Sequence, residues 1–353
     1  MVLGVGLILA AAACSQPAAS MAPSQAPTSQ APTSGAPASA AAAGPGLAEV
    51  CAKAQADEGA LVHWNNHSDR YPAVIEAFEA AYPGIDVQNL TLSPDEQAQR
   101  ILTEVTAGRQ PSTDLGVGEM NVFKPLLDRG TVDTSIDWAA LGVPSEVITP
   151  NNIVRLERVT VGLGYNTEVN SAADLPNTWE DLIDAKWAGR VVVDPRGRPF
   201  DSLGLVWGKE ATLDYVQRLK DIVQPIVIEG GTAGMVAVIG GEADLTTSGR
   251  SESTLEQQAE GAPIALKYLD LIPTLDNNNF PLLGAAHPNA AICFVGWLAT
   301  AGQELYNETE FKRNDTIPPD APADVQVVSV DTPEQAAQVQ ELSELIQPIW
   351  TGS

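Results

Sequence analysis

The chain has 353 residues, with 45 acidic and 19 basic side chains, so its formal net charge at pH 7 is -26. A charge of this size and sign excludes nucleic acid and anionic lipid surfaces as general partners, because both would be repelled. Residues 1–48 carry no charged side chain, which leaves a body of about 305 residues, and at roughly 100–200 residues per domain such a body suggests two domains.

Residues 1–14 have the pattern of an export signal that ends in a lipidation site. Val2 to Ala13 is a short apolar run that ends in three alanines, which is typical of a signal peptide rather than a structural helix. Ala11-Ala12-Ala13-Cys14 resembles the lipobox of bacterial lipoproteins, in which the cysteine is lipidated and becomes the new N-terminus. We therefore expect a lipid anchor at Cys14. The alternative is an unmodified cysteine inside an ordinary cleaved signal.

Residues 15–46 are expected to form a disordered linker. The stretch is rich in Pro, Ala, Ser and Thr, and residues 24–38 read SQAPT, SQAPT, SGAPA. This composition cannot bury enough apolar surface to fold. The apolar leader is also shorter than the roughly 20 residues that a membrane-spanning helix needs, and no other run of the sequence is long and apolar enough.

Helices and strands alternate through the rest of the chain. The first part is predicted to hold helices at 47–57, 72–82 and 120–128 and strands at 60–64, 85–92 and 113–117. A further helix begins at Ser93-Pro94-Asp95-Glu96, because Ser caps it, Pro suits its first turn and Glu follows three residues after the cap. After an irregular stretch, the second part is predicted to hold strands at 190–194, 225–229, 243–247 and 264–268 and helices at 211–223, 235–240, 288–299 and 333–346. This alternation predicts an α/β fold with mainly parallel sheets, in two units.

The cysteines allow two interpretations. If Cys14 carries lipid, Cys51 and Cys293 are the two that remain. Outside the reducing cytosol an adjacent pair would oxidise, so one hypothesis is a disulfide that joins the first helix to a later one. The alternative is two separate buried thiols. Neither cysteine belongs to a CxxC motif.

Polar residues gather where the predicted strands end. Ligands of open parallel sheets bind beyond the carboxyl ends of the strands, so the loops there are candidates for a binding cleft. These loops contribute Asn65, Asn66, His67, Ser68, Glu119, Asp201, Ser202, Gly231, Thr232, Ser248, Arg250 and Ser251. Each has a structural alternative, such as a helix cap for Asn65, Ser68 or Ser202. The convergence of five polar loops carries more weight than any single member.

Arginines and glycines in these loops suggest an anion. Gly230-Gly231 is either a simple turn or a helix start with free backbone N–H groups. Arg250 lies at a strand end between two serines, where it either contacts an anion or pairs with Glu252. Arg196 and Arg198 are interpreted as part of an exposed turn.

Catalytic motifs are scarce. The sequence contains no HExxH, GxSxG or Walker loop, and Gly162-Leu163-Gly164 lacks the third glycine of a dinucleotide fingerprint. An enzyme would need an acid/base pair in the cleft, for which Glu119 and Asp201 are the nearest candidates. The sequence therefore favours binding over catalysis.

Motifs between residues 162 and 195 resemble one protein family. They are Gly162-Leu163-Gly164-Tyr165-Asn166-Thr167, Leu175-Pro176-Asn177-Thr178-Trp179-Glu180-Asp181-Leu182, Lys186-Trp187-Ala188-Gly189-Arg190-Val191 and Asp194-Pro195. In this order they resemble the extracellular solute-binding proteins of ABC importers, in the branch labelled ferric-iron, thiamine, polyamine or phosphonate binding. The similarity extends in order over nearly all of residues 47–310.

The resemblance implies a two-lobe periplasmic-binding-protein type II fold, each lobe a mainly parallel sheet flanked by helices, joined by a hinge. Lobe 1 would comprise residues 47–162 plus 283–353, and lobe 2 residues 163–282. The strands that cross between the lobes would lie near Val159–Asn166 and Phe280–Ala285. Closure of the lobes about such a hinge would hold one ligand between them.

The resemblance also implies a function. The protein would be a lipid-anchored monomer on the periplasmic or extracellular side of the cell membrane, which captures a small solute and delivers it to an ABC permease without chemical conversion or a cofactor. Ferric iron or an iron complex, with or without an anion, is the favoured ligand. A small organic anion such as a phosphonate, a polyamine or thiamine is the alternative, for uptake or sensing, and a secreted hydrolase or transferase on the same fold is a further one.

Two sets of residues are candidates for the ligand. Ferric-iron members commonly use adjacent tyrosines after the strand that here ends at Thr247, where this chain has Ser248, Gly249 and Arg250. The candidates for a metal site rich in oxygen and nitrogen are His67, Glu119, Tyr165 and Tyr268. The residues that instead suggest an anionic group, either on an organic ligand or accompanying a metal, are Thr232, Ser248, Arg250 and Ser251.

Overall fold

The computed structural model describes residues 45–67, 69–311 and 321–352, which lie within the compact unit of residues 40–353. The leader, Cys14, most of the predicted linker and Ser68 lie outside the described residues. The described helices are α1 (Pro45–Asp57), α2 (Pro72–Ala81), α3 (Pro94–Thr106), α4 (Met120–Asp128), α5 (Phe200–Trp207), α6 (Lys209–Val223), α7 (Gly231–Ile239), α8 (Ser251–Ala259), α9 (Pro288–Leu298), α10 (Gln303–Glu310) and α11 (Pro333–Thr351). The described strands are β1 (Ala60–Asn65), β2 (Asp86–Thr91), β3 (Leu115–Gly118), β4 (Val154–Asn166), β5 (Val191–Val193), β6 (Ile226–Val227), β7 (Leu245–Arg250), β8 (Ile264–Lys267), β9 (Leu271–Pro281) and β10 (Gln326–Val328).

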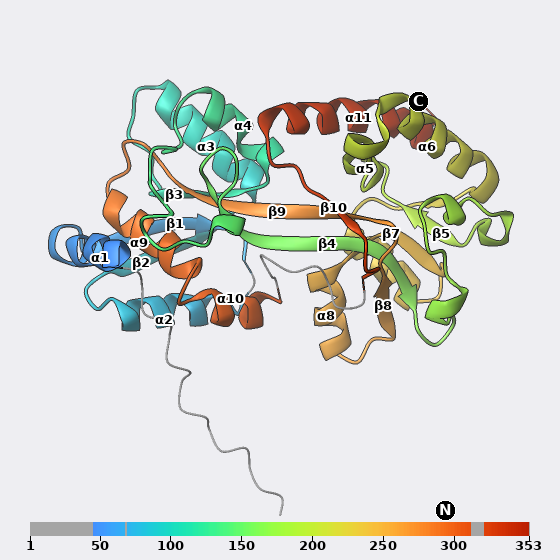
Figure 1. Cartoon of the computed structure of the whole chain (residues 1–353), viewed down its shortest axis with the longest axis horizontal. Coiled ribbons are helices and arrows are strands. Elements are labelled where there is room, and N and C mark those ends of the chain that lie inside the picture. The colour runs from blue at the N-terminus through green and yellow to red at the C-terminus, as the bar shows by residue number, and fades with distance from the viewer. Residues whose placement is uncertain (1–44, 68, 312–320, 353) are drawn as a thin grey trace, which may run out of the picture. The chain divides into compact units, whose positions relative to one another are not determined.

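These strands form one mixed sheet in the order β2-β1-β3-β9-β4-β7-β5-β6, with β10 beside β9 and β8 beside β4. An N-terminal group (β1, β2 and β3) is parallel, and in a central group (β5 to β8) β5 runs parallel to β6 and β7. The long strands β4 and β9 are antiparallel to each other and pass between the two groups (Figure 1). The fold is therefore α/β, with parallel strands in each group and two antiparallel strands that connect them.

The crossing strands differ in how well the sequence predicts them. β4 contains the first predicted crossing, and its second half pairs with β7 and β8. β9 ends at Pro281, so the strand lies earlier than the predicted second crossing near Phe280–Ala285. The reason is the run Asp276-Asn277-Asn278-Asn279, because Asp and Asn are depleted in strands. Pairing with β3 on one side and β4 on the other holds this run extended.

Each strand group has its own apolar core. Leu47, Phe78 and Phe294 are fully buried beside the N-terminal group, and Trp179 and Phe200 are buried beside the central group. Burial of such side chains is worth about 1.5–3 kcal/mol each. The two cores explain why each group can hold its loops in place independently.

The last helix contacts both groups. Ala336, near the start of α11, belongs to an apolar cluster with Phe123 and Phe280, whereas Ile346 and Trp350 near its end pack into the central core. Figure 1 shows α11 running from α4 toward α5 and α6, and it packs against all three. The predicted lobe boundaries, which assign residues 283–353 to lobe 1, stay a prediction. The packing adds that the end of the chain lies against the central group as well.

A disulfide joins Cys51 of α1 to Cys293 of α9, with their Cα atoms 5.0 Å apart. The two cysteines are separated by 242 positions in the sequence, and both are at most 1% exposed. The bond therefore fixes the first described helix to the N-terminal core.

No helix among the described ranges is both long enough and apolar enough to cross a membrane.

Candidate ligand-binding cavity

A cavity of about 420 Å³ lies where the two strand groups and the last helix meet. Its walls come from the start of α4, the loop before α5, the middle of β9 and one side of α11. The residues that line it include Asp95, Glu119, Asn121, Arg196, Arg198, Asp201, Ser202, Thr274, Asp276, Gln340, Ser343, Glu344 and Gln347. A volume in this range is typical of sites for small molecules.

A smaller recess of about 40 Å³ adjoins the cavity and shares Arg196, Arg198, Ser202, Thr274 and Leu275 with it. It adds Gly231, Ser248 and Arg250 from the central group. A single water needs about 10–15 Å³ measured in the same way, so the recess suits a group the size of a carboxylate or a phosphate.

Three arginines face this recess, and each is paired with a carboxylate. Arg196 Nη2 lies 2.7 Å from Asp194 Oδ2, and Arg250 Nη2 lies 2.6 Å from Glu252 Oε1. Arg198 Nη2 lies 3.3 Å from Glu119 Oε2, on the far side of the cavity. The side chains of Arg198 and Arg250 remain about one-third exposed, so they can still contact a ligand.

Helix starts add further positive potential at the recess. Ser202 lies in the first turn of α5, α7 begins at Gly231, and Arg250 is the residue before α8. Backbone N–H groups at a helix start favour an anion. Position 231 requires glycine, because a Cβ there would lie 2.8 Å from the Ser248 carbonyl oxygen. The close approach brings α7 against the end of β7.

Two aspartates beside the arginines respond differently to burial. Burial alone would raise the pKa of Asp194, but hydrogen bonds from Arg196 and from the Gly230 N–H outweigh it, so the pKa is lowered. Burial raises the pKa of Asp201, and the Arg198 charge with bonds from Ser343 and Ser202 compensates only in part. Ser343 Oγ donates to Asp201 Oδ2 at 2.8 Å, which connects α11 to the start of α5.

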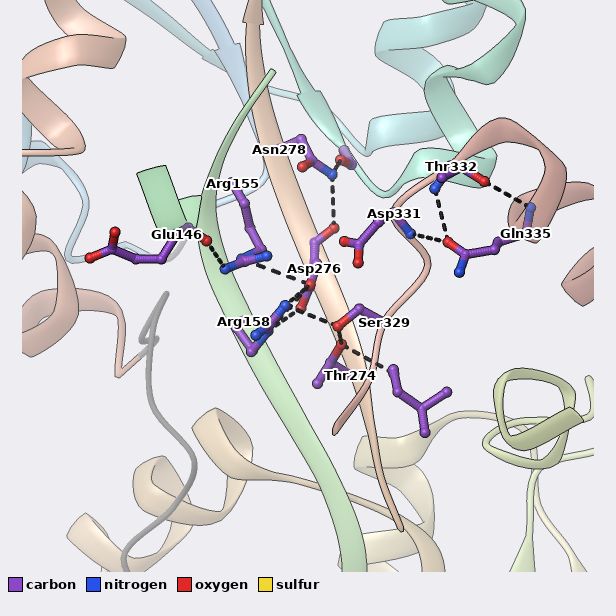
Figure 2. Close-up of polar contacts among 12 residues, drawn as sticks. Glu146, Arg155, Arg158, Thr274, Asp276, Asn278, Ser329, Asp331, Thr332 and Gln335 are labelled. Atoms are coloured by element: carbon purple, nitrogen blue, oxygen red, sulfur yellow. Dashed lines mark hydrogen bonds and ion pairs between the residues drawn. The ribbon is translucent and has the colours of Figure 1, made fainter. Parts of the chain in front are cut away.

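The wall formed by β9 carries its own polar network. Figure 2 shows Asp276 of β9 between Arg155 and Arg158 of β4. Arg158 Nη2 lies 2.9 Å from Asp276 Oδ2 and donates to Ser329 Oγ at 2.9 Å. Burial, together with the charge of Asp276, raises the pKa of Asp331, and the two arginines offset this in part. The network ties both crossing strands to the segment that leads into α11.

Several residues predicted for the site do line it. The structure brings Glu119, Asp201 and Ser202 to the cavity and Ser202, Gly231, Ser248 and Arg250 to the recess. The interpretation of Arg196 and Arg198 as an exposed turn is wrong in part: both arginines line the cavity, although Arg196 is half exposed.

Other predicted residues lie elsewhere among the described ranges. The backbone N–H of His67 donates to Asn65 Oδ1 at 2.9 Å, and both side chains are buried in the N-terminal group, next to Asn66. Ser251 Oγ accepts a hydrogen bond from the Thr160 N–H, and Thr232 is the second residue of α7.

The four residues predicted for a metal site have different surroundings. His67 Nδ1 lies 3.3 Å from Glu157 Oε1 inside a buried cluster, whereas Glu119 lines the cavity. Tyr165 packs in the central core, and the Tyr268 hydroxyl lies 2.8 Å from Thr160 Oγ1. Within the described part of the chain, no group of three or more His, Cys, Asp and Glu side chains is arranged to hold a metal ion.

The sequence analysis did not identify two parts of the site. One is the pair Thr274 and Asp276 on β9, and the other is the face of α11 that carries Gln340, Ser343 and Gln347. The strand-end rule selects the loop after β5 that holds Arg198, but this arginine was interpreted as part of an exposed turn. Nothing in the local sequence of α11 distinguishes its cavity face from an ordinary solvated face.

Comparisons with known proteins agree with this architecture. Residues 119–229 match the sequence model of the family described as bacterial extracellular solute-binding protein. The Fe(3+)-binding periplasmic protein of Serratia marcescens is 25% identical over 205 residues, which cover 56% of this chain and 59% of that protein. The aligned part therefore spans less than two thirds of that relative.

Solved structures extend the similarity over most of the chain. Iron-bound HitA from Pseudomonas aeruginosa has a TM-score of 0.64 and 21% identity, covering 81% of this chain and 99% of that one. AfuA from Actinobacillus pleuropneumoniae, with fructose-6-phosphate bound, has a TM-score of 0.60 and 16% identity, covering 84% and 98%. Residues 119–229 therefore match the model of the extracellular solute-binding family, and the described part of the chain has the same α/β fold as these solved binding proteins.

Proposed function

We propose that this chain is the solute-binding component of an ABC uptake system and that it captures a small anionic solute in the cavity. The observation that carries the proposal is the recess: three arginines and the starts of α5 and α7 surround a space the size of one oxyanion group. The larger cavity has room for the body of the ligand. The protein binds and releases its solute without chemical conversion.

The lining of the recess supports an anion although the chain as a whole is strongly acidic, because it contains Arg196, Arg198 and Arg250 against one carboxylate, Asp194. A guanidinium binds a carboxylate or phosphate through two parallel N–H···O bonds, and such charged bonds contribute about 1.5–3 kcal/mol each. AfuA, which shares the fold, has a sugar phosphate bound. A phosphate group in the recess with a polar body in the cavity is the arrangement that these residues fit best.

A ferric complex is the second candidate, because the curated relative is named as Fe(3+)-binding and HitA is iron-bound. In this chain Tyr165 and Tyr268 do not line the cavity, and no group of three or more His, Cys, Asp and Glu side chains among the described residues is arranged to hold a bare metal ion. Iron would therefore enter as a complex whose anionic part contacts Arg198 and Arg250.

The predicted anchor and partners belong to the same proposal. Lipidation of Cys14 would hold a monomeric receptor at the outer face of the membrane, next to its permease. Replacing Cys14 by serine should move the protein from the membrane fraction to the soluble fraction of the producing cells. Retention of the Cys14→Ser variant in the membrane fraction would contradict the anchor.

A thermal-shift screen of the full chain tests the ligand class. The panel contains inorganic phosphate, fructose 6-phosphate, citrate, ferric citrate, ferric chloride, putrescine and thiamine. A ligand at 100 times its Kd stabilises the folded state by about 2.7 kcal/mol, so a binder raises the melting temperature. We expect shifts with phosphate-bearing compounds, or with ferric citrate if the second candidate is right.

Arginine variants then locate the site. Arg198→Gln should weaken binding of the shifting anion at least tenfold. Arg218→Gln is the matched control, since Arg218 lies on α6 and pairs with Glu180 and Asp214 outside the cavity. Shifts confined to putrescine, thiamine or ferric chloride would contradict the anionic ligand, and equal affinities for the two variants would remove Arg198 from the site.

A further inference from the structure

Glu119 is unlike the other carboxylates that pair with the recess arginines. Asp194 and Glu252 are each two residues away from their arginine in the sequence, so those pairs are local. Glu119 lies 79 positions before Arg198 and reaches it from the start of α4, across the cavity. This pair alone among the three joins the N-terminal and central strand groups.

The Glu119 side chain contacts Arg198 and does not cap α4. Glu119 is the residue before α4, in an extended conformation, and its side chain makes no capping hydrogen bond. Its Oε2 instead accepts from Arg198 Nη2 at 3.3 Å. The Arg198 backbone is held in turn, because its carbonyl oxygen accepts from Ser248 Oγ at 3.1 Å.

The electrostatics agree with a direct contact. The negative charge of Glu119 is the main reason that the pKa of Arg198 is raised, with Asp201 adding to it against burial. Both side chains stay about one-third exposed, at 29% and 33%. An anion entering from the cavity can therefore reach the guanidinium only by sharing it with Glu119 or by displacing Glu119.

We propose that Glu119 is a built-in competitor for the anionic group of the ligand. In the ligand-free protein its carboxylate neutralises Arg198 and connects the two sides of the cavity. When an oxyanion enters, Arg198 exchanges its ion pair with Glu119 for one with the ligand. This inference rests on the proposed anion-binding function and adds that Glu119 lowers affinity, whereas a residue that held the ligand would raise it.

Neutralising Glu119 should therefore tighten binding. We expect Glu119→Gln to bind the probe anion, inorganic phosphate or fructose 6-phosphate, about tenfold more tightly than the wild type by isothermal titration calorimetry at fixed ionic strength. Glu180→Gln is the matched control: Glu180 pairs with Arg218 outside the cavity and the recess, so the affinity of this variant should change less than about twofold. In a Glu119→Gln/Arg198→Gln chain the gain should disappear.

A second measurement does not depend on any ligand. Amide hydrogen exchange of the ligand-free full chain should become faster in Glu119→Gln around residues 119–123 and 196–202, because the connection across the cavity is lost. Exchange in these two segments should stay unchanged in Glu180→Gln. A structural defect would lower affinity, so a gain of affinity distinguishes competition from damage.

The outcomes separate this inference from the function on which it rests. If the wild type binds anions but Glu119→Gln binds them equally or more weakly, or if exchange is unchanged, the anion-binding function stands and the role of Glu119 is wrong. If neither protein binds any anion of the panel, the proposed function is wrong, and the competition is wrong with it.

Discussion

Adding a methyl group at Gly231 tests whether the recess wall is as tight as described. A Cβ at this position would lie 2.8 Å from the Ser248 carbonyl oxygen and 3.2 Å from Arg250 Cδ. The first neighbour is backbone, which cannot rotate away as a side chain can. In Gly231→Ala either α7 or the end of β7 must therefore move, and Arg250 must move with it.

The expected losses follow from these contacts. Overpacking of this kind costs about 1–3 kcal/mol of unfolding free energy. If the shift removes one charged hydrogen bond between Arg250 and the anion, a further loss of about 1.5–3 kcal/mol falls on binding alone. At about 1.4 kcal/mol per tenfold, affinity should fall roughly ten- to hundredfold.

Urea unfolding measures the first loss and calorimetric titration with the anion measures the second. Gly118→Ala is the control, because Gly118 precedes the cavity residue Glu119 but its Cβ would meet Pro94 Cβ at 3.4 Å and Val122 Cβ at 3.8 Å, which are ordinary contacts. It should stay within about 0.5 kcal/mol of the wild type. A Gly231→Ala chain with wild-type stability and affinity would refute the reasoning.

Three further predictions concern stability. Replacing Cys51 and Cys293 by alanine should lower the unfolding free energy by roughly 2–5 kcal/mol, since the disulfide joins residues 242 positions apart. Thiol titration of the denatured, unreduced wild-type chain should find at most the Cys14 thiol. Two further free thiols would show that the disulfide is absent. Tyr306→Phe removes the hydroxyl that donates to the buried Glu157, so urea unfolding should show a loss of about 1–3 kcal/mol, and a loss below about 0.5 would mean that other partners satisfy the carboxylate. Because burial raises the pKa of Asp201 above its ordinary 3.8, the folded state takes up more protons than the unfolded state between 3.8 and the raised pKa. Wild-type stability relative to Asp201→Asn should therefore fall as pH rises through that window, and melting curves in which the difference does not change would contradict the shift.

Sequence patterns predicted most elements because local chemistry and packing agree there. The helix start at Ser93 is an example: the Ser93 side chain accepts from the Glu96 N–H, and the Glu96 carboxylate accepts from the Ser93 N–H, as the spacing predicts. α5 was not predicted, because Gly204 lies within it and glycine disfavours a helix. A Cβ at that position would lie 2.3 Å from Leu342 Cδ1 of α11. Packing against α11 therefore favours glycine at position 204 despite its low helix propensity.

The sequence predicts those residues of the candidate site that lie at the ends of strands. Glu119, Ser248 and Arg250 come directly from that rule. Whether a loop arginine such as Arg198 faces solvent or a cavity depends on segments far away in the sequence, so local reading misplaced it. Tyr268 was predicted as a possible oxygen ligand of a metal, but its hydroxyl lies 2.8 Å from Thr160 Oγ1 inside the fold.

The position of α11 has a consequence for how the protein is made and handled. The cavity walls come from residues as early as Asp95 and as late as Gln347, which lies in the last helix that the structure describes. A nascent chain in which α11 has not yet been made has no complete cavity, so a ligand cannot assist folding before that helix is synthesised. Loss of α11 by proteolysis would open the cavity and uncover the apolar core that Ile346 and Trp350 help to fill, so a fused tag or reporter belongs on a linker beyond this helix.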